Sequence, residues 1–164
     1  MNKKNSLLKT SGIIFLFLSF YTTFEIRENY KVYDFLLIIT ICVFTDIGGY
    51  IFGNILKGPK LTWISPKKTY SGVLGGFLLS LIAGLIFTNY FFVDRKIFNE
   101  NLFLLIVILF ISMISQIGDL IISYFKRKAK IKDTGKIIPG HGGLLDRIDG
   151  MIFVFPIFYL IIIL

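Results

Sequence analysis

The sequence predicts an all-α integral membrane protein, a polytopic bundle of about five transmembrane helices with a polar cavity that faces the cytoplasm. The 164 residues are 55% hydrophobic and only 17% charged, and the apolar residues lie in long unbroken runs. The mean hydropathy is +0.77, whereas soluble domains carry about 25% charged residues. A soluble enzyme, a disordered tail and a disulfide scaffold are therefore excluded, and the chain is expected to form one membrane domain, 1–164.

Five apolar stretches define the predicted helices, at 11–24, 35–56, 72–93, 102–125 and 151–164. The middle three contain the ~20 residues that cross a hydrocarbon core of ~30 Å. The first and last are shorter and need their flanking residues to span. Lysines precede the first stretch as in a signal peptide, but no small-residue cleavage site follows it, which favours a retained helix.

The distribution of basic residues predicts the orientation. With five crossings and the N-terminus in the cytoplasm, 14 of the 18 basic residues fall on the cytoplasmic side. The other four are Arg27, Lys31, Arg95 and Lys96. This positive-inside asymmetry supports an odd number of crossings with a cytoplasmic N-terminus. The chain is expected in a bacterial-type inner (plasma) membrane, with its active site on the cytoplasmic side.

Acidic residues mark the candidate site. Asp46 and Asp119 lie within predicted spans, where an isolated charge costs roughly 3 kcal/mol or more, so a functional role is the default hypothesis. On the fourth span a polar stripe leads to the basic cytoplasmic end; its members are Ser112, Ser115, Gln116, Asp119 and Ser123. The serines alone would also suit an interhelical hydrogen-bond seam.

Small residues predict close helix packing. One face of the second span carries Cys42, Asp46, Gly49 and Gly53, and the third span carries a ridge of Gly72, Gly76, Ser80 and Gly84. Packing alone accounts for the ridge, and Cys42 is expected to be a small buried residue. The polar face of the second span and the polar stripe of the fourth predict a cavity that is walled by the second, fourth and fifth spans.

Two connections carry the charged chemistry. The segment 58–72 contains a Ser65-Pro66 turn followed by Lys67 and Lys68, although a lysine pair at a membrane surface commonly just meets lipid headgroups. The segment 126–149 combines seven basic residues, three aspartates, four glycines and the only histidine. Glycines let backbone amides approach an anion, and carboxylate oxygens without further Cys or His favour Mg²⁺ over zinc.

Asp146 and Asp149, three residues apart, are expected to share a face at the start of the fifth span. A basic pocket with carboxylates suits the joining of a lipid phosphate to a nucleotide phosphate. A phosphate monoester is mostly ionised at pH 7, so such a reaction needs positioning and charge neutralisation rather than a general base.

These motifs resemble those of the phosphatidate cytidylyltransferase (CDP-diacylglycerol synthase) family. The family signature resembles S-x-x-K-R-x-x-x-x-K-D-x-G-x-x-x-P-G-H-G-G-x-x-D-R-x-D, and this chain matches it from Ser123 to Asp149. Upstream, Ser65–Thr69 is similar to the family's S-P-K-K-T loop, and Asp46–Gly53 to its D-x-x-A-Y-x-x-G segment. The resemblance covers about 46–164, which corresponds to the C-terminal catalytic part of the family.

The resemblance implies transfer of a cytidylyl group from CTP to phosphatidate, which yields CDP-diacylglycerol and pyrophosphate, with Mg²⁺ and K⁺ as cofactors. It implies metal ligands at Asp119, Asp146 and Asp149, and a supporting role for Asp46. Phosphate-binding residues would be Ser65, Lys67, Lys68, Lys126, Arg127, Lys132 and Arg147. Catalytic residues would be Asp119, Asp146, Lys126, Arg147 and His141, the histidine as a hydrogen-bond donor or loop-ordering residue. Membrane lipid and a homodimer partner are expected, and nucleic acid is not.

Three departures from the family pattern stand out. Gly49 replaces the usual alanine, and Tyr70-Ser71-Gly72 stands where Trp-Glu-Gly is common. Bacterial members also tend to be about 100 residues longer, with further N-terminal spans. Alternatives to the synthase are a CTP-dependent lipid or polyprenol kinase, a catalytically inactive truncated paralogue, and a small ion transporter that uses Asp46 and Asp119.

Overall fold

The computed structural model describes residues 3–30, 32–91, 101–131, 133–135, 143 and 145–163, with side chains from Thr10 onward except at Asn101. In these ranges the regular elements are helices, apart from one isolated β-bridge. The helices are α1 (Lys3–Asn29), α2 (Val32–Leu56), α3 (Tyr70–Phe91), α4 (Asn101–Lys128), α5 (Leu145–Ile148) and α6 (Met151–Ile163). The predicted fold class, a polytopic helical membrane protein, is confirmed.

Three helices in the described part of the chain are long and apolar enough to cross a membrane: Val32–Leu56, Tyr70–Phe91 and Leu102–Lys128. They correspond to the three long predicted stretches. The helix α6 is apolar but shorter, and α1 is not among the three. Crossing by α1 and α6, and hence the total of five spans, stays a prediction.

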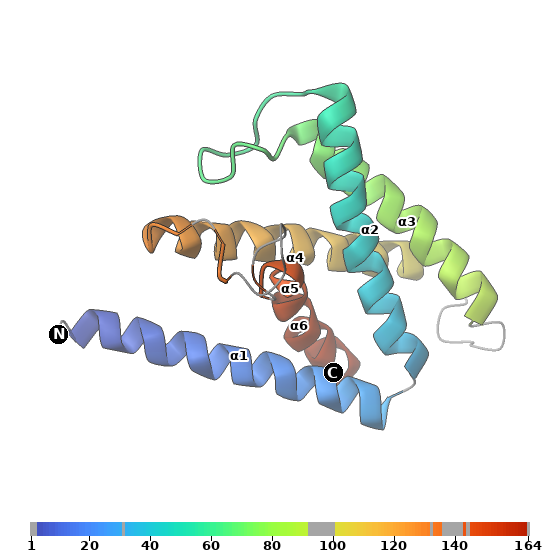
Figure 1. The fold of residues 1–164 in the computed structure, drawn as a ribbon. Coiled ribbons are helices and arrows are strands. Elements are labelled where there is room, and N and C mark those ends of the chain that lie inside the picture. The colour runs from blue at the N-terminus through green and yellow to red at the C-terminus, as the bar shows by residue number, and fades with distance from the viewer. Residues whose placement is uncertain are drawn as a thin grey trace.

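The helices α2 and α3 form a closely packed antiparallel pair (Figure 1). A Cβ atom built on Gly48 would lie 2.3 Å from the Gly75 carbonyl oxygen, and one on Gly72 would lie 2.7 Å from the Gly49 oxygen. The two backbones therefore touch directly, as the glycine ridge predicts. The predicted faces included Gly49 and Gly72 but missed Gly48 and Gly75.

The helix α4 crosses α2 near its middle, where a buried polar contact joins them (Figure 1). The Thr45 hydroxyl donates a 2.8 Å hydrogen bond to the Ser112 hydroxyl, and both side chains are buried. At Ser112, the N-terminal end of the predicted α4 stripe, the polar side chain therefore forms an interhelical hydrogen bond. Around it lies an apolar core from α2, α4 and α6, in which Ile41, Ile108 and Val154 are fully buried.

The end of α4 is closed by a left-handed turn. Lys130 has a φ of 57°, and its N–H donates to the Arg127 carbonyl at 2.9 Å. The Ile131 N–H donates to the Lys126 carbonyl at 3.0 Å. This pair of bonds is a Schellman motif, which ends the helix directly after its basic last turn and so sets the position of Lys126.

Candidate active site

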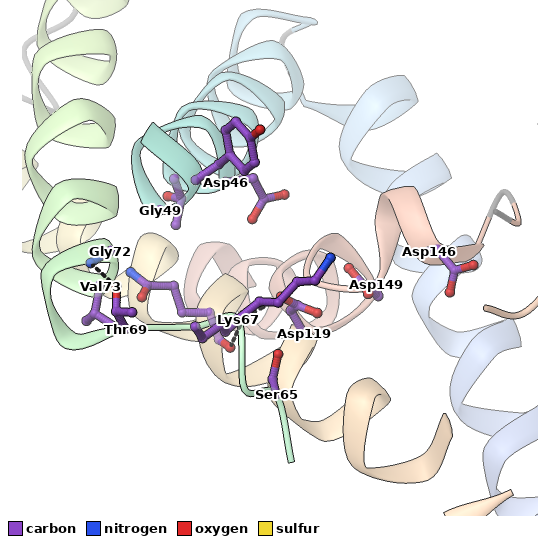
Figure 2. Close-up of a pocket in the computed structure, with 14 residues that line it drawn as sticks. Asp46, Gly49, Ser65, Lys67, Thr69, Gly72, Val73, Asp119, Asp146 and Asp149 are labelled. Carbon is purple, nitrogen blue, oxygen red and sulfur yellow. Dashed lines mark hydrogen bonds and ion pairs between the residues drawn. The ribbon is translucent and has the colours of Figure 1, made fainter. Parts of the chain in front are cut away.

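A cavity of about 300 Å³ lies where α2, the start of α3, α4, α5 and the α2–α3 connection meet (Figure 2). Seven residues predicted for the site line it: Asp46, Ser65, Lys67, Lys68, Asp119, Asp146 and Asp149. The other lining residues are Thr45, Gly49, Tyr50, Thr69, Gly72, Val73 and Gln116. The prediction that the second and fourth spans wall the cavity is confirmed, but the third span contributes as well. The C-terminal wall comes from the α5 segment rather than from α6.

Asp119 pairs with a lysine from the α2–α3 connection. The Lys68 ammonium forms an ion pair with the Asp119 carboxylate and lies 3.5 Å from the Gln116 carbonyl oxygen. The Ser123 hydroxyl donates to the other Asp119 oxygen at 3.4 Å. Residues far apart in the sequence therefore meet on one acidic group, which brings the predicted S-P-K-K-T loop onto the polar stripe of α4.

Asp149 lies beside Asp119 in the floor of the cavity (Figure 2). Its side chain is buried, and its Oδ1 accepts the Gly150 N–H at 2.9 Å. Burial, followed by the neighbouring Asp119 carboxylate, raises the pKa of Asp149 to about 7. The two carboxyl groups are therefore close enough to repel each other when both are ionised, and a cation between them would reduce this repulsion.

Asp146 is held differently, because it organises the chain around it. Its Oδ2 accepts the backbone N–H groups of Thr134 and Gly143, both at 2.9 Å, and its Oδ1 lies 3.0 Å from the Lys126 ammonium. Burial alone would raise its pKa, but these donors outweigh burial and lower the pKa of Asp146 to about 2. Asp146 is therefore ionised at neutral pH and ties the preceding connection to α5.

This arrangement predicts the effect of Asp146→Asn on local order. An asparagine keeps one oxygen for the two amides but lacks the negative charge, and its NH2 group would face the Lys126 ammonium in place of Oδ1. Amide hydrogen exchange at Thr134 and Gly143 should rise at least about tenfold, since charge-assisted hydrogen bonds are the strong ones. Exchange in α3 should be unchanged, and unchanged rates at Thr134 and Gly143 would contradict the assignment. The measurement is exchange mass spectrometry in detergent micelles.

The prediction that Asp146 and Asp149 share a face at the start of the last long helix is wrong, because both residues precede α6. The chain forms the single turn α5, turns again at Asp149-Gly150, and only then enters α6. The Lys126 ammonium bridges them instead, at 3.0 Å from Asp146 and 3.5 Å from Asp149. Lys126 therefore acts within the site as the counter-ion of two carboxylates.

Other predicted residues are not at the cavity. Arg127 is exposed and donates to the Ile131 carbonyl at 3.4 Å, and Arg147 is exposed as well. Lys132 and His141 lie outside the described residues. Conversely, the site prediction missed Tyr50, Thr45 and Val73, and it placed Gln116 on the stripe without a site role. Tyr50 falls within the D-x-x-A-Y-type segment, which was the available signal.

The acidic residues only partly match the predicted metal site. Among the described residues, no three His, Cys, Asp or Glu side chains form a group that could hold a metal ion. Asp119 and Asp149 nevertheless form a close pair of oxygen donors. Mg²⁺ is commonly held by one or two carboxylates, with water and substrate phosphates as its other ligands. The donor set therefore fits a hard divalent cation held by Asp119 and Asp149, with Asp146 engaged by Lys126 and backbone amides.

Fold and site together define an integral membrane protein whose cavity combines lysines with a close pair of carboxylates, of which Asp149 is buried, an arrangement suited to binding phosphate esters. Comparison with known sequences narrows this class. The chain belongs to the cytidylyltransferase family, whose sequence pattern matches residues 2–164. The match begins well before Asp46, where the resemblance seen in the motifs starts.

Individual relatives are similar over most of this chain. It is 43% identical over 150 residues to a phosphatidate cytidylyltransferase of Staphylococcus haemolyticus (strain JCSC1435), which covers 90% of this chain and 54% of the relative. The corresponding protein of Staphylococcus aureus (strain COL) is 43% identical over 93% of this chain and 55% of its own length. That of Rickettsia bellii (strain RML369-C) is 43% identical over 77% and 54%. The chain thus spans about half the length of the curated relatives it matches.

Proposed function

We propose that this protein transfers a cytidylyl group from CTP to phosphatidate, giving CDP-diacylglycerol and pyrophosphate. The observation that carries the proposal is the cavity in which Lys67 and Lys68 face the Asp119–Asp149 pair. Family membership and the names of the relatives support the same reaction. Both substrates are phosphate esters, so a site built from opposed cations and carboxylates suits their union.

In this reaction a phosphatidate oxygen attacks the α-phosphorus of CTP, and the bond between the α- and β-phosphates breaks. The attacking phosphate is mostly ionised at pH 7, so no side chain has to remove a proton. Lys67 and Lys68 would bind phosphate oxygens, with Ser65 as a hydroxyl donor at the same edge of the cavity. Lys126 would keep Asp146 and Asp149 in place and add positive charge beside them.

Mg²⁺, held by Asp119 and Asp149, would neutralise charge on the reacting phosphates when bound. Asp46 lines the same cavity and would support this pair. K⁺ as a second cation, catalytic or phosphate-binding roles for Arg127, Lys132, His141 and Arg147, and a homodimer belong to the proposal through the family resemblance. The proposed cytoplasmic location of the N-terminus and cavity is supported by the 14-to-4 division of basic residues.

The test is pyrophosphate release by the purified chain in detergent–lipid micelles with CTP, Mg²⁺ and phosphatidate, each omitted in turn. Release that depends on all three is expected, and replacing K⁺ by Na⁺ should lower it. Release of CDP instead would show a lipid kinase. Absence of either product from folded protein would contradict the proposal for this chain.

A paired lysine substitution tests the phosphate-binding role. Lys68→Met removes the cation that contacts Asp119 in the cavity, and pyrophosphate release should fall about 100-fold or more, as for loss of one preorganised donor. Lys128→Met is the matched control, because Lys128 is exposed at the end of α4 and does not line the cavity. Equal activities of the two variants would remove Lys68 from the binding site.

A further inference from the structure

The connection between α2 and α3 is an ordered hairpin. Lys60 and Thr69 form an antiparallel bridge, and the Leu61 N–H donates to the Lys68 carbonyl at 2.8 Å. At the tip, the Lys68 N–H donates to the Ser65 carbonyl at 3.0 Å, closing the turn. The backbone is therefore pinned at its base and at its tip, so the direction in which its side chains point is set by the fold. We name residues 57–69 the α2–α3 hairpin.

The two faces of this hairpin differ. Ser65, Lys67 and Lys68 line the cavity, whereas the side chain of Trp63 has a relative exposure of 102%. The indole thus touches nothing else in the described part of the protein. An indole is a large apolar group with one N–H donor, and it is favoured at membrane–water interfaces, where one end is apolar and the other hydrated.

The position of the hairpin indicates what covers Trp63. It joins the ends of α2 and α3, two of the three helices long enough to span the membrane. Large side chains next to it are exposed, with Leu56 at 60%, Tyr70 at 54% and Leu74 at 69%. Such exposure in spanning helices marks a lipid-facing surface, and here that surface continues to the base of the hairpin. The hairpin thus begins where the apolar, lipid-facing surface of the two helices ends, which is the level at which lipid headgroups begin.

The charge of the hairpin points to the same partner. Residues 57–69 contain four lysines and no acidic residue, and two of these lysines, Lys57 and Lys60, are exposed and do not line the cavity. Anionic headgroups attract basic segments next to the membrane, and each lysine near the surface adds to this attraction. A hairpin that exposes an indole together with Lys57 and Lys60 therefore matches an anionic lipid surface in both apolar character and charge.

We propose that the tip of the α2–α3 hairpin is an interfacial anchor, with Trp63 seated among anionic lipid headgroups of the leaflet on which the cavity opens. The anchor holds the opposite face of the hairpin, with Lys67 and Lys68, against the cavity. It rests on the membrane fold and on the exposed indole, and does not depend on the reaction proposed above.

The chain offers a direct test, because Trp63 is its only tryptophan. The full chain is placed in nanodiscs that hold one copy each, so that no second copy can cover the indole. Discs are made from phosphatidylcholine with or without phosphatidylglycerol. Quenching of Trp63 fluorescence is compared for aqueous iodide and for lipids brominated either near the headgroup or near the methyl end of the acyl chain.

With phosphatidylglycerol present, the Trp63 emission maximum should lie at shorter wavelength than that of N-acetyltryptophanamide. Bromine near the headgroup should quench it more than bromine near the methyl end, and iodide should quench it weakly. A depth control is the double variant Trp63→Phe, Leu78→Trp, since Leu78 lies in the middle of α3 and is 48% exposed. Its tryptophan should be quenched most by bromine near the methyl end.

Two results would overturn the proposal. One is emission like that of the free indole, quenched by iodide and not by brominated lipid, which would place Trp63 in water. The other is identical quenching with and without phosphatidylglycerol, which would remove the role given to the lysines. Neither outcome bears on pyrophosphate release, so the anchor and the proposed function can fail separately.

Discussion

Asp119→Asn is expected to lower pyrophosphate release on the order of 10³-fold while leaving the protein folded. Asp119 is the group on which the site converges, because it pairs with Lys68, accepts from Ser123 and lies beside Asp149. Asparagine has nearly the same size but no charge, so Lys68 would lose its partner and the cation proposed between the two carboxylates would be bound more weakly. Preorganised charge of this kind is usually the largest single contribution to catalysis.

The control for this substitution is Glu28→Gln. Glu28 is a partly exposed carboxylate near the end of α1 that pairs with Arg27 and does not line the cavity. Removing its charge should leave both activity and the elution profile in detergent unchanged. Near-normal activity of Asp119→Asn, measured on protein of equal monodispersity, would exclude Asp119 from the cation site and weaken the proposed mechanism.

Gly48→Ala is expected to destabilise the packing of α2 against α3. The added Cβ would lie 2.3 Å from the carbonyl oxygen and 2.8 Å from the carbonyl carbon of Gly75. These are backbone atoms, so the contact is relieved only if the two helices move apart. Overpacking of this kind costs about 1–3 kcal/mol, and the apparent Tm in detergent should fall accordingly.

The neighbouring glycine provides a matched control. A Cβ on Gly49 would meet only the Gly72 carbonyl oxygen at 3.7 Å, an ordinary van der Waals distance. Gly49→Ala should therefore keep the wild-type Tm or raise it slightly, because alanine is the better helix former by about 1 kcal/mol. Equal Tm values for both variants would show that α2 and α3 are not held in direct backbone contact.

The three long helices could be predicted because their information is local. A span needs only enough consecutive apolar residues, and the predicted stretches 35–56, 72–93 and 102–125 agree with α2, α3 and α4 within three residues at every end. Part of the candidate site could be predicted from the sequence for a related reason. A carboxylate in an apolar run is costly, so Asp46 and Asp119 stand out without any knowledge of their neighbours.

Partners across the fold could not be predicted in this way. The Gly48–Gly75 contact depends on how two helices rotate against each other, and spacing along each helix leaves that rotation open. The same holds for the contribution of Tyr50 and Val73 to the cavity, because it depends on where the α2–α3 pair meets α4. Helix faces follow from sequence periodicity, but the angle between helices follows from the packing of both.

The sequence by itself determined that this is a helical membrane protein and which family it resembles, and it predicted which lysines and aspartates line the candidate site. Only the tertiary structure decided how these charges pair. In it, Lys68 pairs with Asp119, and Lys126 pairs with both Asp146 and Asp149. Asp149 lies beside Asp119, whereas Asp146 is held by Lys126 and backbone amides. The physical reason is that each charge in an apolar environment must find a counter-charge, and several pairings satisfy the sequence equally well. The backbone geometry around α5 and the α2–α3 hairpin selects one of them.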